Sequence, residues 1–364
     1  MQIRAAVVKK YTDPYVIETI DLEPPRGSEL LVKIHSCGVC HTDELARMGK
    51  LPVPMPAVLG HEGCGIVEAT GADVKEFAAG DKVTFSFASC GSCSACLSGT
   101  PTICEIFPAI NFGGVQPDGT SRLSQHGKPL ATMFGQSAFA EYAIVHERTA
   151  VKVPDNIPLE ITGPLGCGIQ TGAGAVWNRL RPRPGSSIAV FGCGSVGLSA
   201  IMAAKVSGCG MIIGVDRTDS RLEMALELGA THVVDTSQTP DAVAEIRKLT
   251  DLGADCAIDT TGNALCTRMS LQCTRPGSDT VVVGGGGDIV INVELDLMSV
   301  SKSLIGVVEG DSNPKVFIPE ILEHYQKGRF PFDKLISYYS FDQISEAMSD
   351  THSGKAIKAV LKML

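Results

Sequence analysis

The feature that most restricts the fold of this chain is an alternation of short apolar runs with amphipathic stretches in its second half. The apolar runs have the length of strands, and helix-like patterns follow the first three of them. The runs lie at residues 187–191, 211–215, 232–234, 256–259 and 279–283. Such an alternation is typical of a parallel sheet whose strands are joined by crossover helices.

The flanking parts of the chain have a different pattern. Residues 1–165 are rich in glycine, proline and short β-type runs, which indicates an irregular β-rich domain. Beyond about residue 307 we expect a helix over 314–327, a strand near 334–339, a helix over 341–351 and a last strand over 355–362. A chain of 364 residues is long enough for about two domains.

A glycine-rich turn follows the first apolar run and leads into a helix-like stretch. This G-x-G-x-x-G turn consists of Gly192, Cys193, Gly194, Ser195, Val196 and Gly197. The glycines permit a tight turn, a close approach to a pyrophosphate and close helix packing, and the helix N-terminus offers free N–H groups to phosphates. The turn predicts a dinucleotide site; the alternative is a glycine-rich turn that binds no cofactor.

The residue after the second apolar run bears on the kind of dinucleotide. A carboxylate at Asp216 would accept hydrogen bonds from the adenosine ribose and repel a 2′-phosphate. Asp216 therefore favours NAD over NADP. Arg217 is able to accept that phosphate, which leaves residual NADP use open.

Four cysteines lie close together in the first half of the chain, namely Cys90, Cys93, Cys96 and Cys104. Four thiolates at this spacing suit a tetrahedral ion with soft ligands, and zinc fits best. The alternatives are a chance cluster, a disulfide pair or an iron–sulfur cluster. A site closed by four thiolates is structural, so the cluster predicts a zinc protein without predicting its chemistry.

The charge and hydropathy of the chain exclude several classes of protein. A net charge of -9 without a basic tract argues against nucleic acid and anionic membranes as partners. No apolar run reaches the roughly 18 residues of a membrane span, and the first residues lack the apolar core of a signal peptide. Thirteen cysteines in such a chain indicate a reducing compartment, so we expect a cytoplasmic protein.

Three further potential metal ligands lie far apart in the sequence. Cys40, His61 and Cys167 each lie in a segment flanked by glycine. Two cysteines and one histidine are a ligand set of catalytic zinc that keeps one position open. Buried free cysteines are common, however, and a single histidine is more often a structural residue with satisfied hydrogen bonds. Spacing alone leaves both interpretations open.

Five motifs in one order carry a resemblance to a known family. They are Cys40-His41-Thr42-Asp43, Gly60-His61-Glu62-Gly63, the four-cysteine cluster, Gly166-Cys167-Gly168 with Thr171-Gly172, and the nucleotide turn. Together they resemble the zinc-dependent medium-chain alcohol dehydrogenases over essentially the whole chain. Residues 118–122 also resemble the longer, animal-type members, and the overall pattern resembles bacterial aryl (benzyl) alcohol dehydrogenases.

The resemblance implies an α/β architecture in which a Rossmann, doubly wound parallel sheet is inserted in a β-rich, GroES-like catalytic domain. We expect the catalytic domain to comprise residues 1–168 and 308–364, and the NAD-binding domain to comprise 169–307. Two zinc ions per subunit and NAD are the implied cofactors. A homodimer or homotetramer joined through sheet edges near residues 280–308 is also implied.

The resemblance further implies that an alcohol binds at the open position of a zinc held by the three separated ligands, and passes a hydride to NAD. Thr42 matches the residue whose hydroxyl relays the proton, since a hydroxyl both donates and accepts. Asp43 matches a carboxylate that orients His61. Glu62 matches an acid that helps exchange ligands, with a simple hydrogen-bonding role as the alternative.

Further residues match cofactor contacts of the family. His41 and Lys358 correspond to residues near the pyrophosphate, Thr171 to one near the nicotinamide, and Arg221 to one near the adenosine ribose. Solvated surface charge is the alternative for Arg221 and Lys358. Many members carry a histidine at the outer end of the proton relay where this chain has Leu45. We therefore expect alcohol oxidation to depend more strongly on pH than in those members.

The expected substrate pocket is apolar and suits aromatic alcohols, with allylic terpene alcohols as a related class. The candidate lining, about half of which we expect to be ordinary core, is Phe85, Phe87, Ile106, Phe107, Ile110, Phe112, Met133 and Phe134. A dehydrogenase of the S-(hydroxymethyl)glutathione (formaldehyde) adduct would need a basic group near the pocket mouth, and residues 105–117 contain none.

Four other readings of the same motifs remain as alternatives. They are this glutathione-adduct enzyme, a general aliphatic alcohol dehydrogenase, a non-catalytic NAD-binding protein on the same fold, and a zinc-free reductase of the superfamily. The loss of a catalytic ligand would favour the last two. Cys40, His61, Cys167 and Thr42 are all present, which opposes them.

Overall fold

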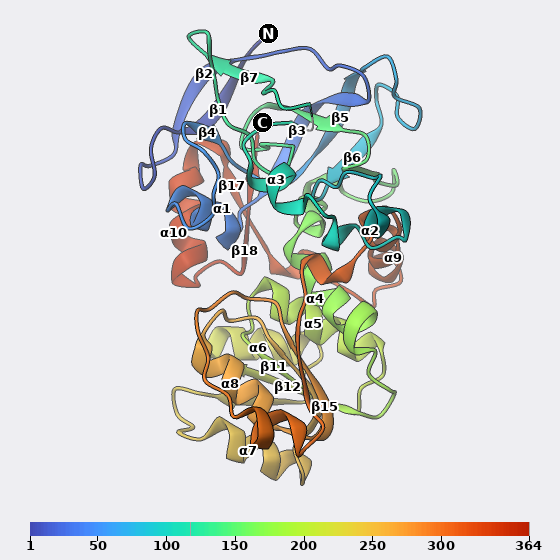
Figure 1. Cartoon of the computed structure of the whole chain (residues 1–364), viewed down its shortest axis with the longest axis vertical. Helices are drawn as coiled ribbons and strands as arrows, with labels where there is room; N and C mark the ends of the chain where they lie inside the picture. Colours follow the sequence, from blue (N-terminus) through green and yellow to red (C-terminus); the bar gives the residue numbers. More distant parts are fainter. Residues whose placement is uncertain (117, 364) are drawn as a thin grey trace. The chain divides into compact units, whose positions relative to one another are not determined.

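The computed structural model describes residues 1–116 and 118–363 and divides into two compact units (Figure 1). The first unit comprises residues 1–167, 313–322 and 333–364, and the second comprises 168–312 and 323–332. The chain thus passes from the first unit to the second twice, at residues 168 and 323, and returns at residues 313 and 333. Within the described residues, no helix is both long and apolar enough to cross a membrane.

Two sheets build the first unit. One has the strand order β4 (Ala57–Val58), β1 (Gln2–Val8), β2 (Val16–Leu22), β7 (Leu123–Gln125) and β8 (Lys128–Pro129). The other has the order β10 (Ala150–Lys152), β6 (Lys82–Phe85), β5 (Glu62–Thr70), β3 (Glu29–Gly38), β18 (Lys358–Lys362) and β17 (Ile336–Ser340), with β9 (Tyr142–His146) also paired to β3. Large side chains such as Phe85, Phe139 and Leu59 are fully buried between these elements.

Strand β3 pairs with three other strands of the larger sheet, β5, β9 and β18. Its pairing with β5 shifts register at two places, which bends a strand and increases its twist. The C-terminal strand β18 pairs with the end of β3 in antiparallel register, Val360 opposite Gly38. Residues more than 300 positions apart in the sequence are therefore neighbours at the point where β3 ends.

The helices of the first unit are short. They are α1 (His41–Arg47), α2 (Ser94–Leu97), α3 (Phe107–Phe112), α10 (Ile344–Ser353) and most of α9 (Pro314–Gln326). Single 3-10 turns lie at Pro101–Ile103, Leu159–Ile161, Gly163–Gly166, Phe332–Leu335 and Phe341–Gln343. The helix predicted over 341–351 thus begins as a 3-10 turn, and it ends at Gly354, whose φ of 83° is typical of a residue that terminates a helix.

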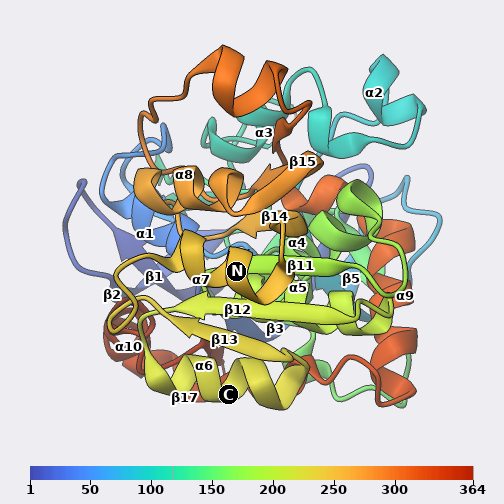
Figure 2. The same cartoon turned by 90° about the horizontal axis from the view of Figure 1, so that it is seen from below.

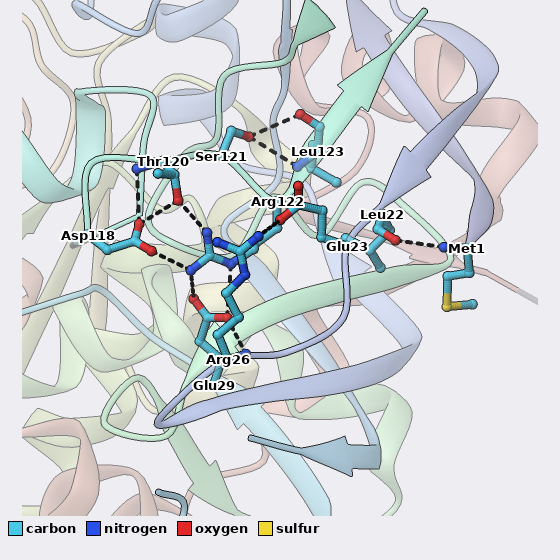
Figure 3. Close-up of polar contacts among 10 residues, drawn as sticks. All are labelled: Met1, Leu22, Glu23, Arg26, Glu29, Asp118, Thr120, Ser121, Arg122 and Leu123. Atoms are coloured by element: carbon cyan, nitrogen blue, oxygen red, sulfur yellow. Dashed lines mark hydrogen bonds and ion pairs between the residues drawn. The ribbon is translucent and has the colours of Figure 1, made fainter. Parts of the chain in front are cut away.

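A buried ion pair fastens segment 118–122 to the start of β3 (Figure 3). Arg122 donates from Nε and Nη2 to the carboxylate of Glu29, at 3.0 and 2.7 Å. Its Nη2 also reaches Asp118 Oδ2 at 2.6 Å, and its Nη1 donates to Thr120 Oγ1. The side chains of Arg122 and Glu29 are 3% and 9% exposed. Pro117, the last residue of the segment without basic groups, lies outside the described residues.

The second unit contains one parallel sheet of six strands (Figure 2). Its order is β13 (His232–Asp235), β12 (Met211–Asp216), β11 (Ser187–Phe191), β14 (Ala254–Asp259), β15 (Thr274–Val282) and β16 (Ser303–Gly306). The helices are α4 (Gly168–Gly174), α5 (Ser195–Val206), α6 (Asp219–Leu228), α7 (Ala242–Thr250) and α8 (Ala264–Gln272), with a 3-10 turn at Glu309–Asp311 and π-helical turns at Ala175–Leu180 and Val293–Met298. This strand order is that of a doubly wound Rossmann sheet, which confirms the predicted fold class.

The sequence patterns do not predict two elements of the second unit, helix α8 and strand β16. Helix α8 begins after Asn263, whose side chain accepts hydrogen bonds from the backbone N–H groups of Leu265 and Cys266. That cap was a readable start signal. No residue of strand β16 is buried, so the strand has no inward-facing hydrophobic pattern to detect.

The only tryptophan of the chain lies in the second unit. The Nε1–H of Trp177 donates to the carbonyl of Ala203 at 3.0 Å. Its ring lies 4.9 Å from the ring of His324 and 5.6 Å from that of Phe330, measured between ring centroids. These contacts hold segment 323–332 against the helices that flank the sheet.

Candidate functional site

Asp43 organises the loop that carries the first two potential metal ligands. Strand β3 ends at Gly38, Cys40 is still extended, and α1 begins at His41. The buried carboxylate of Asp43 accepts hydrogen bonds from Cys40 N at 3.2 Å, Gly60 N at 3.0 Å and His61 Nδ1 at 2.8 Å. The last bond fixes the imidazole in the tautomer that protonates Nδ1, so Nε2 is available as a ligand atom.

The Nε2 atom of His61 is buried and has no hydrogen-bond partner among the described residues. A buried polar atom without a partner costs free energy, so such atoms are rare unless a ligand satisfies them. One ligand atom each of Cys40, His61, Glu62 and Cys167 lies within 4.8 Å of the others. Thiolate sulfur, imidazole nitrogen and carboxylate oxygen are the ligand atoms that zinc binds in proteins, so the residue types of this cluster fit zinc.

Cys167 reaches the cluster because glycines let its loop approach the sheet closely. A Cβ atom on Gly166 would come within 1.9 Å of the carbonyl oxygen of Phe85, and one on Gly163 within 2.4 Å of that of Glu62. Only glycine therefore fits at these two positions. The thiol of Cys167 forms a hydrogen bond with Cys40, and this bond, against the opposing effect of burial, holds the pKa of Cys40 well below its ordinary value.

Glu62 is paired with a lysine from the far end of the chain. Lys358 Nζ lies 2.8 and 3.0 Å from the two carboxylate oxygens of Glu62 and donates to the carbonyl of Val39 at 3.1 Å. Burial raises the pKa of Glu62 to about 7, and the ammonium of Lys358 limits that rise. The register of β18 on β3 creates this contact, which sequence reasoning missed. The expected contact of Lys358 with a pyrophosphate stays a prediction, although its ammonium is buried here.

Thr42 and the neighbouring residues of α1 lie beside the cluster. The Oγ1 atom of Thr42 is 3.6 Å from the sulfur of Cys40, and its side chain is half-buried. His41 is exposed at the start of the helix, and Leu45 is half-buried one turn later. Thr42 is thus the hydroxyl that the structure places against a candidate ligand.

Aromatic rings pack on one side of the His61 imidazole. The ring of Phe134 lies 4.6 Å from that of His61, and Phe112 meets Phe134 edge-on at 5.4 Å. Of the expected pocket residues, Phe85, Phe87, Met133 and Phe134 belong to the main core, while Ile110 packs beside the cysteine cluster and Ile106 is 46% exposed. The side of His61 that faces Phe134 is therefore apolar.

The four clustered cysteines form a separate potential metal site in the first unit. One sulfur each of Cys90, Cys93, Cys96 and Cys104 lies within 4.8 Å of the others. Backbone N–H groups of Ser92 and Cys93 donate to the sulfur of Cys90, and these bonds lower its pKa to about 6. All thirteen cysteines of the chain are free, so the cluster contains no disulfide.

The glycine-rich turn of the second unit has the geometry that its sequence predicts. Gly192 has a φ of 88°, and a Cβ on Gly197 would lie 1.7 Å from the carbonyl oxygen of Gly192. A Cβ on Gly194 would meet nothing within 4 Å, so this is the open side of the turn. Ser195 and Val196 begin α5 and are half-exposed, as phosphate-binding N–H groups require.

Asp216 is held at the end of β12 by three backbone donors. They are the N–H groups of Cys193 at 2.7 Å, Arg217 at 2.8 Å and Thr218 at 3.0 Å. A guanidinium nitrogen of Arg221 lies 4.0 Å from the same carboxylate, so these two predicted cofactor contacts are neighbours. The first hydrogen bond ties Asp216 directly to the glycine-rich turn.

Thr171 is buried on α4 in the second unit. A Cβ on the next residue, Gly172, would lie 2.0 Å from the carbonyl oxygen of Val196, so α4 packs tightly on the start of α5. The structure thus groups Thr171 with the nucleotide turn. The predicted metal site and its neighbours form the other group, within the first unit: Cys40, Thr42, Asp43, His61, Glu62, Cys167 and Lys358.

Comparisons with known proteins agree over the whole chain. Residues 26–155 match the family model "Alcohol dehydrogenase GroES-like domain", and residues 195–324 match "Zinc-binding dehydrogenase". The geraniol dehydrogenase of Castellaniella defragrans is 45% identical over 362 residues, which are 98% of this chain and 97% of that protein.

Two solved structures are similarly close. An alcohol dehydrogenase zinc-binding domain protein from Burkholderia ambifaria is 44% identical with a TM-score of 0.97, covering 100% of this chain and 99% of that one. The benzyl alcohol dehydrogenase of Acinetobacter calcoaceticus is 42% identical with a TM-score of 0.96, covering 100% of both chains.

Proposed function

Because this chain belongs to the zinc-dependent medium-chain alcohol dehydrogenase family, we propose that it oxidises aromatic or allylic primary alcohols to aldehydes with NAD, reversibly. The observation that carries the proposal is the unpartnered Nε2 of His61 among the sulfurs of Cys40 and Cys167. The names of two relatives, a geraniol dehydrogenase and a benzyl alcohol dehydrogenase, support an allylic or aromatic substrate. The aromatic rings of Phe134 and Phe112 beside His61 fit both.

Cys40, His61 and Cys167 would hold the catalytic zinc, and the four clustered cysteines a structural one. Bound in the open site, zinc would supply Lewis acidity that lowers the pKa of an alcohol hydroxyl, and NAD would supply the hydride acceptor. The depressed pKa of Cys40 keeps a thiolate ready for the metal. The cysteine cluster has no open position in its ligand set, which fits a structural role.

The remaining residues of the site would orient and move protons. Asp43 keeps Nε2 of His61 directed at the metal position. Thr42 would take the hydroxyl proton at Oγ1 and release it towards solvent, because Leu45 offers no group to carry it further. Glu62 would stay paired with Lys358 beside the metal position.

The second unit would bind NAD. Its glycine-rich turn would receive the pyrophosphate, and Asp216 with Arg221 the adenosine ribose. We propose further that His41 and Thr171 contact the cofactor, as their matching positions in the family do.

We propose the division that the sequence predicts, with the catalytic domain at residues 1–168 and 308–364. The two compact units have limits at 167 and 312, and segment 323–332 belongs to the second unit. We propose a cytoplasmic homodimer or homotetramer. Exposed apolar side chains support an interface near the β16 edge, namely Val290, Val293, Leu295, Met298 and Val308.

The proposal is tested by a substrate panel read as kcat/KM from the absorbance of reduced nicotinamide. Benzylic and allylic alcohols are expected to exceed short aliphatic alcohols and S-(hydroxymethyl)glutathione. Cys167→Ser should abolish turnover, whereas Cys273→Ser, at a buried cysteine outside both clusters, should retain it. Absence of turnover by the zinc-loaded wild type on every alcohol would exclude the proposed activity.

A further inference from the structure

One buried amide joins the loops that surround the candidate zinc site. Gln136 is 2% exposed. Its Nε2 donates to the carbonyl oxygens of His61 at 2.8 Å and of Ser86 at 3.2 Å, and its Oε1 accepts from Gly63 N at 3.2 Å. One side chain is thus bound to the backbone on either side of Glu62, beginning at His61 itself, and to the residue that follows β6.

Ser86 extends this connection to the other loop. Its hydroxyl donates to the carbonyl oxygen of Gly166 at 2.8 Å, and its side chain is fully buried. Gly166 immediately precedes Cys167. A continuous buried chain of hydrogen bonds therefore runs from the backbone of His61 through Gln136 and Ser86 to the residue before Cys167.

The turn that presents Gln136 is strained. Phe134, Gly135 and Ser137 have φ values of 54°, 61° and 53°. The left-handed conformation costs a non-glycine residue about 1–2 kcal/mol, and such strain persists only where surrounding contacts determine it. The contacts are present, because Ala138 N donates to Gly60 O at 2.8 Å and Phe134 N to Asn111 O at 2.8 Å. The turn directs Gln136 inward and places Phe134 on the imidazole of His61.

We propose that Gln136 and Ser86 are positioning residues that set the separation of His61 and Cys167. Neither side chain is in the cluster of candidate ligand atoms. They act on the backbones that carry two of those atoms, and metal sites tolerate errors of only about 0.5 Å in ligand placement. This inference rests on the proposal that His61 and Cys167 hold zinc.

The test compares two buried glutamines of the first unit. Gln136→Met removes the donor and the acceptor at similar volume. Gln116→Met is the matched control, since Gln116 is 4% exposed and its side chain donates to the carbonyl of Ile144 at 3.4 Å, a residue that carries no candidate ligand. Ser86→Ala removes the second link. Each variant is examined for zinc loss to a chelator, for the visible spectrum of the cobalt-substituted protein and for urea unfolding.

Gln136→Met is expected to lose the catalytic-site zinc about 10- to 100-fold faster than wild type and to alter the cobalt spectrum. Ser86→Ala should change both in the same direction. Gln116→Met should lower the unfolding free energy while zinc loss and the cobalt spectrum stay those of wild type. A change in kcat/KM without these metal signals does not support the inference.

The inference is overturned if Gln136→Met is destabilised but keeps wild-type zinc loss and cobalt spectrum, since its role is then structural only. If Gln136→Met does not fold, Ser86→Ala decides in the same way. Zinc content of Cys167→Ser separates the two proposals. If Cys167→Ser binds as much zinc as wild type, the proposed metal site itself is wrong. If it lacks one zinc and Gln136→Met behaves as wild type, only the positioning role is wrong.

Discussion

A single carboxylate shows how much of the site depends on one residue. Asp43 satisfies two backbone N–H groups and the imidazole of His61 at once, in a fully buried position. Its substitution therefore alters the loop, the imidazole orientation and the tautomer together. This convergence makes Asp43 more sensitive to substitution than its distance from the reacting atoms would indicate.

We expect Asp43→Ala to lower kcat/KM by about 10- to 100-fold, as losses of such hydrogen-bond partners do. The unpaired donors should also lower the unfolding free energy by roughly 1–3 kcal/mol. Steady-state kinetics and urea denaturation measure the two effects. Asp81→Ala is the control: its carboxylate also accepts a backbone hydrogen bond, from Ala78, but lies at the surface, so activity should be unchanged. Wild-type kinetics in Asp43→Ala would contradict this role.

Some residues of the candidate site can be predicted from the sequence, whereas several of their contacts cannot. The ligand types of Cys40, His61 and Cys167 are readable, but only family resemblance joined them, because a local pattern does not encode contacts over 100 residues. The Glu62–Lys358 pair follows from the register of β18 on β3, which no local signal specifies. The contacts of Gln136 depend on a turn in which Phe134 has a left-handed conformation. Phenylalanine rarely adopts this conformation, so the sequence does not predict the turn.

At the scale of elements, residues 88–110 around the four clustered cysteines, here called the cysteine lobe, have little apolar core of their own. Its buried cluster consists of Ala88, Cys104 and Ile110, with Phe107 and the other cysteines packed around it. Leu97 and Ile103 are 75% and 65% exposed. A lobe of this kind gains most of its stability from the bound ion.

Cys93→Ser is expected to release one zinc per chain and to lower the melting temperature, with Cys40→Ser losing activity at a smaller cost in stability. Calorimetry with metal analysis measures both. Ser94→Ala, at the exposed neighbour of Cys93, controls for substitution within the lobe. Equal melting losses in Cys93→Ser and Cys40→Ser would show that the two sites do not divide structural and catalytic roles.

The buried ion pair between Arg122 and Glu29 also stabilises the contact between separate elements. Arg122→Leu leaves the buried Glu29 without its partner, and breaking a buried pair in this way costs roughly 3–5 kcal/mol. Arg26→Leu breaks an Arg–Glu pair that is 55% and 45% exposed, so about 0–1 kcal/mol is expected. Urea denaturation compares them, and equal losses would contradict the importance of burial.

The hydrogen bonds between Arg122 and Asp118 predict that the folding stability of the protein falls at acid pH. Although burial opposes the shift, hydrogen bonds from Arg122 and Thr120 lower the pKa of Asp118 to about 2. A carboxyl whose folded-state pKa is depressed stabilises the protein above its unfolded pKa of about 4 and loses this contribution as pH falls towards 2. The stability difference between wild type and Asp118→Asn should therefore shrink between pH 4 and pH 2. A constant difference would show that Asp118 is not ionised in the pair.

Element boundaries show where sequence patterns succeed. The alternation over 187–283 correctly predicts five of the six strands of the sheet, because each contains at least one buried apolar residue. It does not predict β16, in which no residue is buried. It also places the start of β15 too late, at residue 279, because that strand begins at Thr274 with polar and glycine residues.

For the whole molecule, the exposed apolar residues around the end of the sheet are the main unexplained surface. Covering them would remove apolar area from water, which favours association. Val293→Glu is therefore expected to shift the proposed oligomer to a smaller mass in analytical ultracentrifugation. Leu252→Glu, equally apolar and 73% exposed on the turn after α7, should not. A wild-type monomer would exclude the proposed interface.

Trp177 gives the molecule a built-in optical probe. It is the only indole in the chain, and it is held in the second unit by its contacts with Ala203, His324 and Phe330. Fluorescence excited at the red edge of the spectrum, where the six tyrosines absorb little, comes from this unit alone. Circular dichroism sees the β-rich unit as well. Melting curves recorded by both methods on one sample will therefore reveal whether the nucleotide-binding half and the metal-binding half unfold together or in sequence.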